Sequence, residues 1–90
     1  DIDMAIKVEV FSTNSCPHCP AAIDAALAAE AKFGNSIEVE SVKIDESEEN
    51  RQRAIDYQIM AVPTIVIDGD VAFVGAPSDA ELIEKIESLS

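Results

Sequence analysis

Apolar and polar residues alternate in several short segments of the chain, a pattern typical of half-buried β-strands. The first of these segments covers residues 6–13, and a second covers residues 37–44. The alternation of the second segment slips near its middle, which either a β-bulge or a bend would explain. Two further segments, 64–67 and 71–74, flank Asp68-Gly69-Asp70 and predict a β-hairpin.

The longest helical segment covers residues 16–33, which are rich in alanine and contain no glycine. Pro17 and Pro20 fall in its expected first turn, where a missing backbone N–H removes little. Gly34 then supplies a C-terminal stop.

Two shorter helices complete the pattern. Asp45 or Ser47 can cap the first, which we expect to end near Tyr57 and to carry a thin apolar face of Ala54 and Ile55. A capping box opens the second, and its residues are Ser78, Asp79, Ala80 and Glu81. The order βαβαββα predicts an α/β domain. In it, two parallel strands joined by a helix are extended by an antiparallel hairpin into a four-stranded mixed sheet.

The length of 90 residues fits one domain. We expect it to cover residues 5–90, after an N-terminal extension or cloning remnant at residues 1–4. The chain opens without the basic and apolar regions of a signal peptide, and it has no apolar run of membrane-spanning length. We therefore expect a cytoplasmic protein with no membrane partner.

The net charge of −12 argues against nucleic acid as a partner, because phosphate recognition needs clustered lysine and arginine. The acidity fits two explanations, solubility in a salty cytoplasm or selection among protein partners by charge.

The only two cysteines and the only histidine lie together in Cys16-Pro17-His18-Cys19, between the first strand and the first helix. Thiols at this spacing close into a disulfide with little backbone movement when the second lies in the first turn of a helix. The first is then expected at the helix N-terminus, where unpaired N–H groups and the helix dipole favour its thiolate. In a reducing compartment such a pair is usually catalytic or metal-binding.

These features resemble the thioredoxin and glutaredoxin superfamily, and most closely the small, glutaredoxin-sized thioredoxins of archaea. Residues 11–20 (FSTNSCPHCP) and residues 57–64 (YQIMAVPT) carry the resemblance, and Gly75 after the last strand also matches. It extends over nearly the whole chain, from about residue 5 to residue 89. It implies the thioredoxin fold, a four-stranded mixed sheet flanked by three helices.

The family mechanism, carried over to this chain, makes Cys16 the attacking nucleophile and Cys19 the more buried, resolving thiol. The resemblance also implies that Pro63 is cis and holds its loop against the thiols. Val62 would offer backbone groups to an extended substrate strand. The reversible disulfide would need no cofactor and no metal.

Redox tuning is expected from Pro17 and His18. His18 either stabilises the Cys16 thiolate through a partly charged imidazole or is a solvent-facing filler. The chain also departs from its relatives, because Val10 stands where many thioredoxins have a buried aspartate. Water, Glu9 or another group must then accept the proton of the second thiol.

The function that this resemblance implies is that of a thiol-disulfide oxidoreductase of thioredoxin type. It would act as a monomer, reduce protein disulfides and be recharged by an electron donor of thioredoxin-reductase type. One alternative is a glutathione-dependent glutaredoxin, but glutathione is itself anionic and the charge of −12 should repel it. Another alternative is a metal or iron–sulfur cluster carrier. A single CxxC cannot complete a four-ligand zinc site within one chain.

Overall fold

The computed structural model describes residues 5–89, so the expected extension at residues 1–4 lies outside the described residues. The elements follow the predicted order, with one 3₁₀ turn added after the first helix. They are β1 (Ile6–Ser12), α1 (Cys19–Phe33), the 3₁₀ turn η1 (Gly34–Ser36), β2 (Ile37–Lys43), α2 (Glu48–Asp56), β3 (Thr64–Ile67), β4 (Asp70–Val74) and α3 (Asp79–Leu89).

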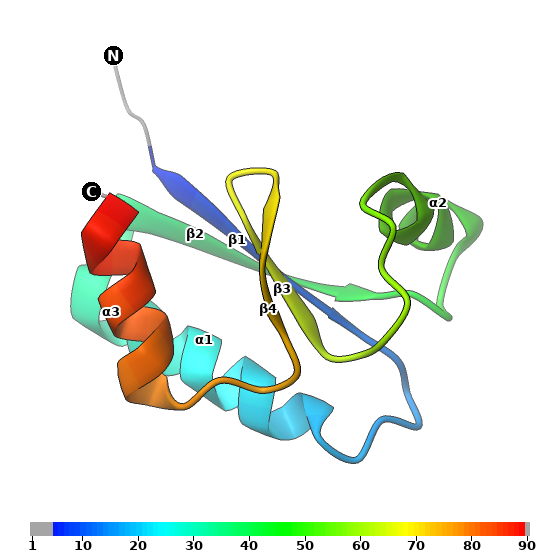
Figure 1. Ribbon diagram of the computed structural model, residues 1–90, viewed down its shortest axis with the longest axis horizontal. Coiled ribbons are helices and arrows are strands. Elements are labelled where there is room, and N and C mark those ends of the chain that lie inside the picture. The colour runs from blue at the N-terminus through cyan, green and yellow to red at the C-terminus, as the bar shows by residue number, and fades with distance from the viewer. Residues whose placement is uncertain (1–4, 90) are drawn as a thin grey trace.

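The four strands form one mixed sheet in the order β2-β1-β3-β4. β1 and β2 are parallel, whereas β3 runs antiparallel to both β1 and β4. Helices α1 and α3 cover one face of the sheet and α2 lies on the other (Figure 1). This arrangement confirms the predicted four-stranded mixed sheet flanked by three helices.

Strand β2 contains no bulge against its neighbour, because its parallel register with β1 is uninterrupted from end to end. Ile37 and Val39 pack in the core cluster formed with α1 and α3, whereas Val42 and Ile44 pack in the cluster formed with α2. The slip in alternation therefore marks a change of buried face. One end of β2 is covered by α1 and α3, and the other end is covered by α2.

The buried face of α1 consists of small side chains. Beyond Cys19, its buried residues are Ala22, Ala25, Ala26 and Ala29. Alanine favours the helix and lets it lie close to the sheet. The larger side chains of this core come from the strands and from Leu82 and Ile86 of α3.

Helix α2 is held to the sheet largely by polar contacts. Ala54 is its one buried residue among those the structure describes, and Ile55 is 56% exposed, so the expectation that Ile55 faces the core is wrong. Arg53 instead donates a hydrogen bond to Glu40 of β2 (3.1 Å) and pairs with the buried carboxylate of Glu9 on β1. The Tyr57 hydroxyl donates to the same Glu9 carboxylate (3.2 Å). These contacts fix the helix from which the loop toward β3 departs.

Local signals in the sequence set the ends of the shorter elements. Ser47 caps α2 by accepting a hydrogen bond from the backbone N–H of Asn50 (3.1 Å). Ser78 and Glu81 make both hydrogen bonds of the predicted capping box, at 2.9 and 3.1 Å. In the hairpin, Asp68 and Gly69 have φ angles of 50° and 86°, as a tight turn between twisted strands requires. Within residues 5–89, the structure contains no helix with the length and apolar character needed to cross a membrane.

Candidate active site

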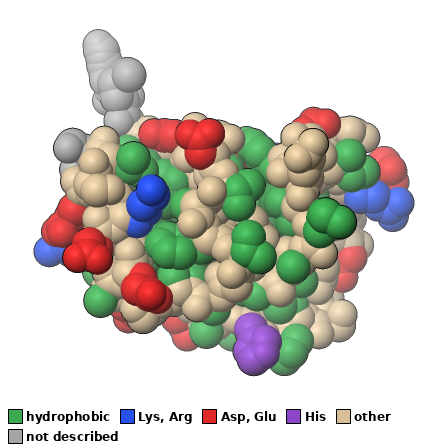
Figure 2. Space-filling model, viewed as in Figure 1, with side chains coloured by type: hydrophobic (Ala, Val, Ile, Leu, Met, Phe, Trp, Pro, Cys, Tyr) green, Lys and Arg blue, Asp and Glu red, His purple; other side chains and the backbone are tan. Residues whose placement is uncertain are grey.

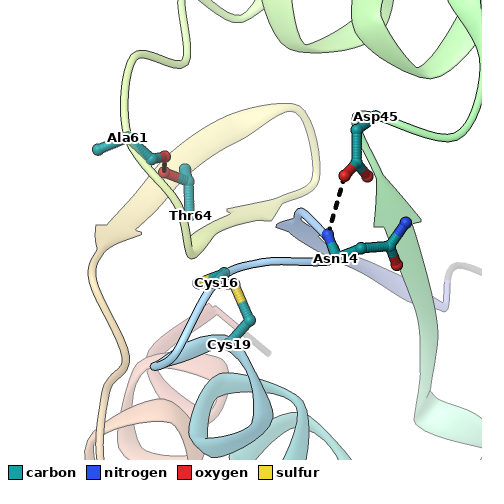
Figure 3. The surroundings of a disulfide bond; sticks show 6 residues. All are labelled: Asn14, Cys16, Cys19, Asp45, Ala61 and Thr64. Atoms are coloured by element: carbon teal, nitrogen blue, oxygen red, sulfur yellow. Dashed lines mark hydrogen bonds between the residues drawn. A yellow bond between two sulfur atoms is a disulfide. The ribbon is translucent and has the colours of Figure 1, made fainter.

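Cys16 and Cys19 are joined in a disulfide, and their Cα atoms lie 5.5 Å apart (Figure 3). Cys16 belongs to the loop between β1 and α1 and is partly exposed. Cys19 is the first residue of α1 and is only 3% exposed. Of the two cysteines, Cys16 is therefore the one that a large molecule can reach.

Helix α1 begins later than the sequence predicted. Its N-cap is His18, so the expectation that Cys16 and Pro17 belong to the helix is wrong. The reason is Pro20, which has no N–H to donate to the carbonyl of Cys16 and so prevents the helical ladder from starting there. The disulfide nevertheless holds the Cys16 sulfur against Cys19, at the start of the helix.

The loop between α2 and β3 lies beside the disulfide (Figure 3). The Val62–Pro63 peptide bond in it is cis, and Pro63 is buried while Val62 is partly exposed. The Thr64 hydroxyl donates to the carbonyl of Ala61 (2.7 Å), and the N–H of Gly75 donates to the carbonyl of Pro63 (2.7 Å). These two hydrogen bonds fix the conformation of the loop that contains Pro63.

Asp45 fixes the loop before the first cysteine. Its carboxylate accepts a hydrogen bond from the backbone N–H of Asn14 (3.0 Å), as Figure 3 shows. The N–H of Cys16 turns back to the carbonyl of Thr13 (3.4 Å). The sequence suggested Asp45 only as a helix cap, because nothing in the local pattern indicates that the end of β2 lies beside this loop.

The turn between the two cysteines is exposed to solvent. Pro17 and His18 are both exposed, and the His18 side chain makes no capping hydrogen bond. Figure 2 shows the single histidine beside hydrophobic side chains, away from the acidic groups visible in that view. Met60 is 96% exposed and Val74 is 71% exposed, and both line a shallow groove next to the Pro63 loop.

Glu9 is not placed to accept a proton from Cys19. Its carboxylate is engaged by Arg53 and Tyr57, which belong to α2 and the residue after it. Cys19 opens α1, on the opposite face of the sheet. The sheet therefore separates the two groups. Burial raises the pKa of the Tyr57 hydroxyl, and the nearby Glu9 carboxylate adds to this effect.

No cluster of three or more His, Cys, Asp or Glu side chains suited to a metal ion occurs within residues 5–89. Both cysteines are engaged in the disulfide. In this state, the structure supports thiol-disulfide chemistry at the pair.

Comparisons with known proteins agree with this geometry. The family model of the thioredoxin domain matches residues 4–87. A probable thioredoxin of Methanothermobacter marburgensis is 48% identical over 83 residues, which cover 92% of this chain and 94% of the relative. A thioredoxin of Methanocaldococcus jannaschii is 45% identical over 82 residues, covering 91% and 93%. Among solved structures, Fasciola hepatica thioredoxin has a TM-score of 0.76 at 26% identity and covers 98% of this chain and 84% of its own.

The chain therefore belongs to the thioredoxin domain family. With the Cys16–Cys19 pair in place, it is a thiol-disulfide oxidoreductase of thioredoxin type. The similarity to small archaeal thioredoxins is confirmed, because these relatives match over nearly their whole length.

Proposed function

We propose that this protein reduces disulfide bonds in client proteins, with Cys16 as the nucleophile and Cys19 as the resolving thiol. The observation that supports these roles is the difference in exposure between the two cysteines, since Cys16 is partly exposed and Cys19 is 3% exposed. A client can reach the first sulfur, while the second reacts only inside the protein.

In the first step, the Cys16 thiolate attacks one client sulfur and the client disulfide breaks. The other client sulfur leaves as a thiolate and takes a proton from water. Cys19 then gives its proton to water and attacks the Cys16 sulfur, so that the bond between Cys16 and the client breaks. The released sulfur is protonated in turn. The client has gained two electrons and two protons, and Cys16 and Cys19 end as the disulfide seen in the structure.

The Pro63 loop is proposed to hold the client. Val62 lies at the edge of the site, where its backbone groups can pair with an extended client strand. The exposed side chains of Met60 and Val74 would add apolar contact beside that strand. Pro17 and His18 occupy the exposed turn between the two thiols and would tune their redox potential.

We further propose that the protein works in the cytoplasm as a monomer that needs no cofactor. A reductant of this type requires a compartment that keeps thiols reduced. A reductase of thioredoxin-reductase type would supply its electrons. The net charge of −12 opposes both nucleic acid and anionic glutathione as partners.

The test is reduction of insulin by dithiothreitol, followed by turbidity, with and without the protein. The wild type should accelerate the reaction, Cys16→Ser should abolish the acceleration, and Cys19→Ser should accumulate mixed disulfides visible by mass spectrometry. Ser15→Ala, next to the pair but outside its chemistry, serves as the matched control. Full activity in Cys16→Ser would refute the assigned roles. Turnover of a glutathione mixed disulfide without insulin reduction would favour a glutaredoxin instead.

A further inference from the structure

A buried hydroxyl at the end of β1, where the chain leaves toward the redox pair, lacks a hydrogen-bond partner. Within residues 5–89, Ser12 Oγ is the one buried side-chain oxygen or nitrogen without a partner, and Ser12 is 0% exposed. Thr64, a buried hydroxyl residue on the neighbouring strand, donates to the carbonyl of Ala61. Buried polar groups are almost always paired, so the unpaired hydroxyl of Ser12 calls for a physical explanation.

The sheet register places Ser12 beside the Pro63 loop. The antiparallel register of β1 with β3 ends at the pair Phe11–Thr64, and one further step sets Ser12 opposite Pro63. Because strand residues alternate between faces, Ser12 shares a face with Val10, which packs against α1. Ser12 is the last residue of β1, at the end of the sheet where the chain leaves toward Cys19 and α1.

We propose that the Ser12 hydroxyl donates a hydrogen bond to the Cys19 sulfur when the disulfide is open. This inference rests on the proposed redox cycle. A disulfide sulfur is a poor acceptor, whereas a thiolate accepts strongly, especially in a buried site. The hydroxyl therefore has no partner in the oxidised state described here and gains one in the reduced state. In this way Ser12 couples its own hydrogen bonding to the redox state of the protein.

Ser12 acts as a donor and keeps its own proton throughout the cycle. Cys19 still releases its proton to water before it attacks the Cys16 sulfur. The hydrogen bond stabilises the reduced Cys19 sulfur, as the thiol and more strongly as the attacking thiolate, and so favours the open pair over the disulfide. A protein with this bond is a weaker reductant than the same protein without it.

Lys43 is the charged neighbour whose effect must be separated from that of Ser12. It pairs with Ser12 in the parallel register of β1 and β2, and it is partly buried. Its ammonium group would also favour a thiolate on this side of the sheet. Lys43→Gln removes that charge and leaves the Ser12 hydroxyl in place, so it serves as the matched control.

The decisive experiment measures the reduction potentials of Ser12→Ala and Ser12→Thr against the wild type, and that of Ser12→Ala/Lys43→Gln against Lys43→Gln alone. Ser12→Ala should shift the equilibrium toward the disulfide about tenfold, which lowers the potential by about 30 mV. Ser12→Thr, which retains the hydroxyl, should keep the wild-type potential. The Ser12→Ala shift should persist in the Lys43→Gln background.

Unfolding measurements in both redox states exclude a merely structural role. Ser12→Ala should stabilise the oxidised protein and destabilise the reduced protein, whereas a simple packing change would shift both in the same direction. An unchanged or raised potential in Ser12→Ala, or equal shifts in both states, would overturn the proposal. Insulin reduction by the wild type tests the redox function separately, so a working reductant with a potential insensitive to Ser12 would refute this inference alone.

Discussion

The contacts of Arg53 allow a quantitative prediction about how α2 is held. Arg53 pairs with Glu9, whose side chain is 7% exposed, and with Glu40, while its guanidinium lies 5.9 Å from the centre of the Phe11 ring. Arg53→Met keeps an unbranched apolar side chain of similar length and removes the charge. Glu9 is then left as a buried carboxylate without its cationic partner.

Breaking a buried ion pair by removing one partner costs about 3–5 kcal/mol. Because the Arg53 side chain is itself 30% exposed, water can reach the vacated site. We therefore expect a loss near the lower limit, about 3 kcal/mol. At about 4–8 °C per kcal/mol for a domain of this size, the midpoint of thermal unfolding should fall by about 12–24 °C.

The assay is urea unfolding of the oxidised protein, followed by circular dichroism, with thermal unfolding as a second measurement. The double variant Glu9→Gln/Arg53→Met removes the isolated charge and should recover most of the lost stability. Arg53→Lys keeps the charge but cannot contact Glu9 and Glu40 at the same time, so its loss of stability should be intermediate. A loss below about 1 kcal/mol in Arg53→Met, the value of a surface pair, would refute the reasoning, as would no recovery in the double variant.

Three further predictions concern the fold and the site. The Arg53 guanidinium, with help from Lys7, holds the pKa of Glu40 at about 2, below its usual value of 4.5. Glu40 thus contributes stability that is present above about pH 5 and is lost as the pH falls toward 2. Because the Glu40 side chain is 41% exposed, this contribution to stability is about 1 kcal/mol. In an acid titration, Glu40→Gln should therefore lose stability less steeply than the wild type. A curve as steep as that of the wild type would contradict the assignment. Ser47→Ala should cost about 1 kcal/mol in urea unfolding through loss of the α2 cap, and no loss would show that the cap is dispensable. His18→Ala should lower the reduction potential by about 20 mV or less, since an exposed charge contributes about 1 kcal/mol at most, and a raised potential would reject an electrostatic role.

Local patterns in the sequence predicted most of the fold. The capping box at Ser78 and the hairpin turn at Gly69 depend on interactions within a few residues, and the structure confirms both. Hydrophobic alternation located all four strands. It was misleading in β2, because alternation records which side chains are buried, and there the covering helices change from one face of the sheet to the other.

The sequence predicted only those parts of the candidate site that lie in short motifs. The cysteine pair and Pro63 stand out in the sequence, and the structure places the segment from Ala61 to Thr64, which contains Pro63, beside the disulfide (Figure 3). The contact of Asp45 with the loop before Cys16 joins residues distant in the chain, so no local signal indicates it. The position of Ser12 beside Pro63 likewise requires the register of β1 and β3, which the hydrophobic pattern alone does not fix.

The proposed function requires that Cys16 and Cys19 interconvert between a disulfide and two free thiols in the folded protein. The most direct measurement is equilibration in dithiothreitol redox buffers, followed by acid quenching, alkylation and mass spectrometry. We expect a single reversible two-electron transition from zero to two alkylated cysteines, with the fold retained at both ends. Cysteines that stay unchanged across all buffers, or a protein that unfolds when the disulfide opens, would contradict it.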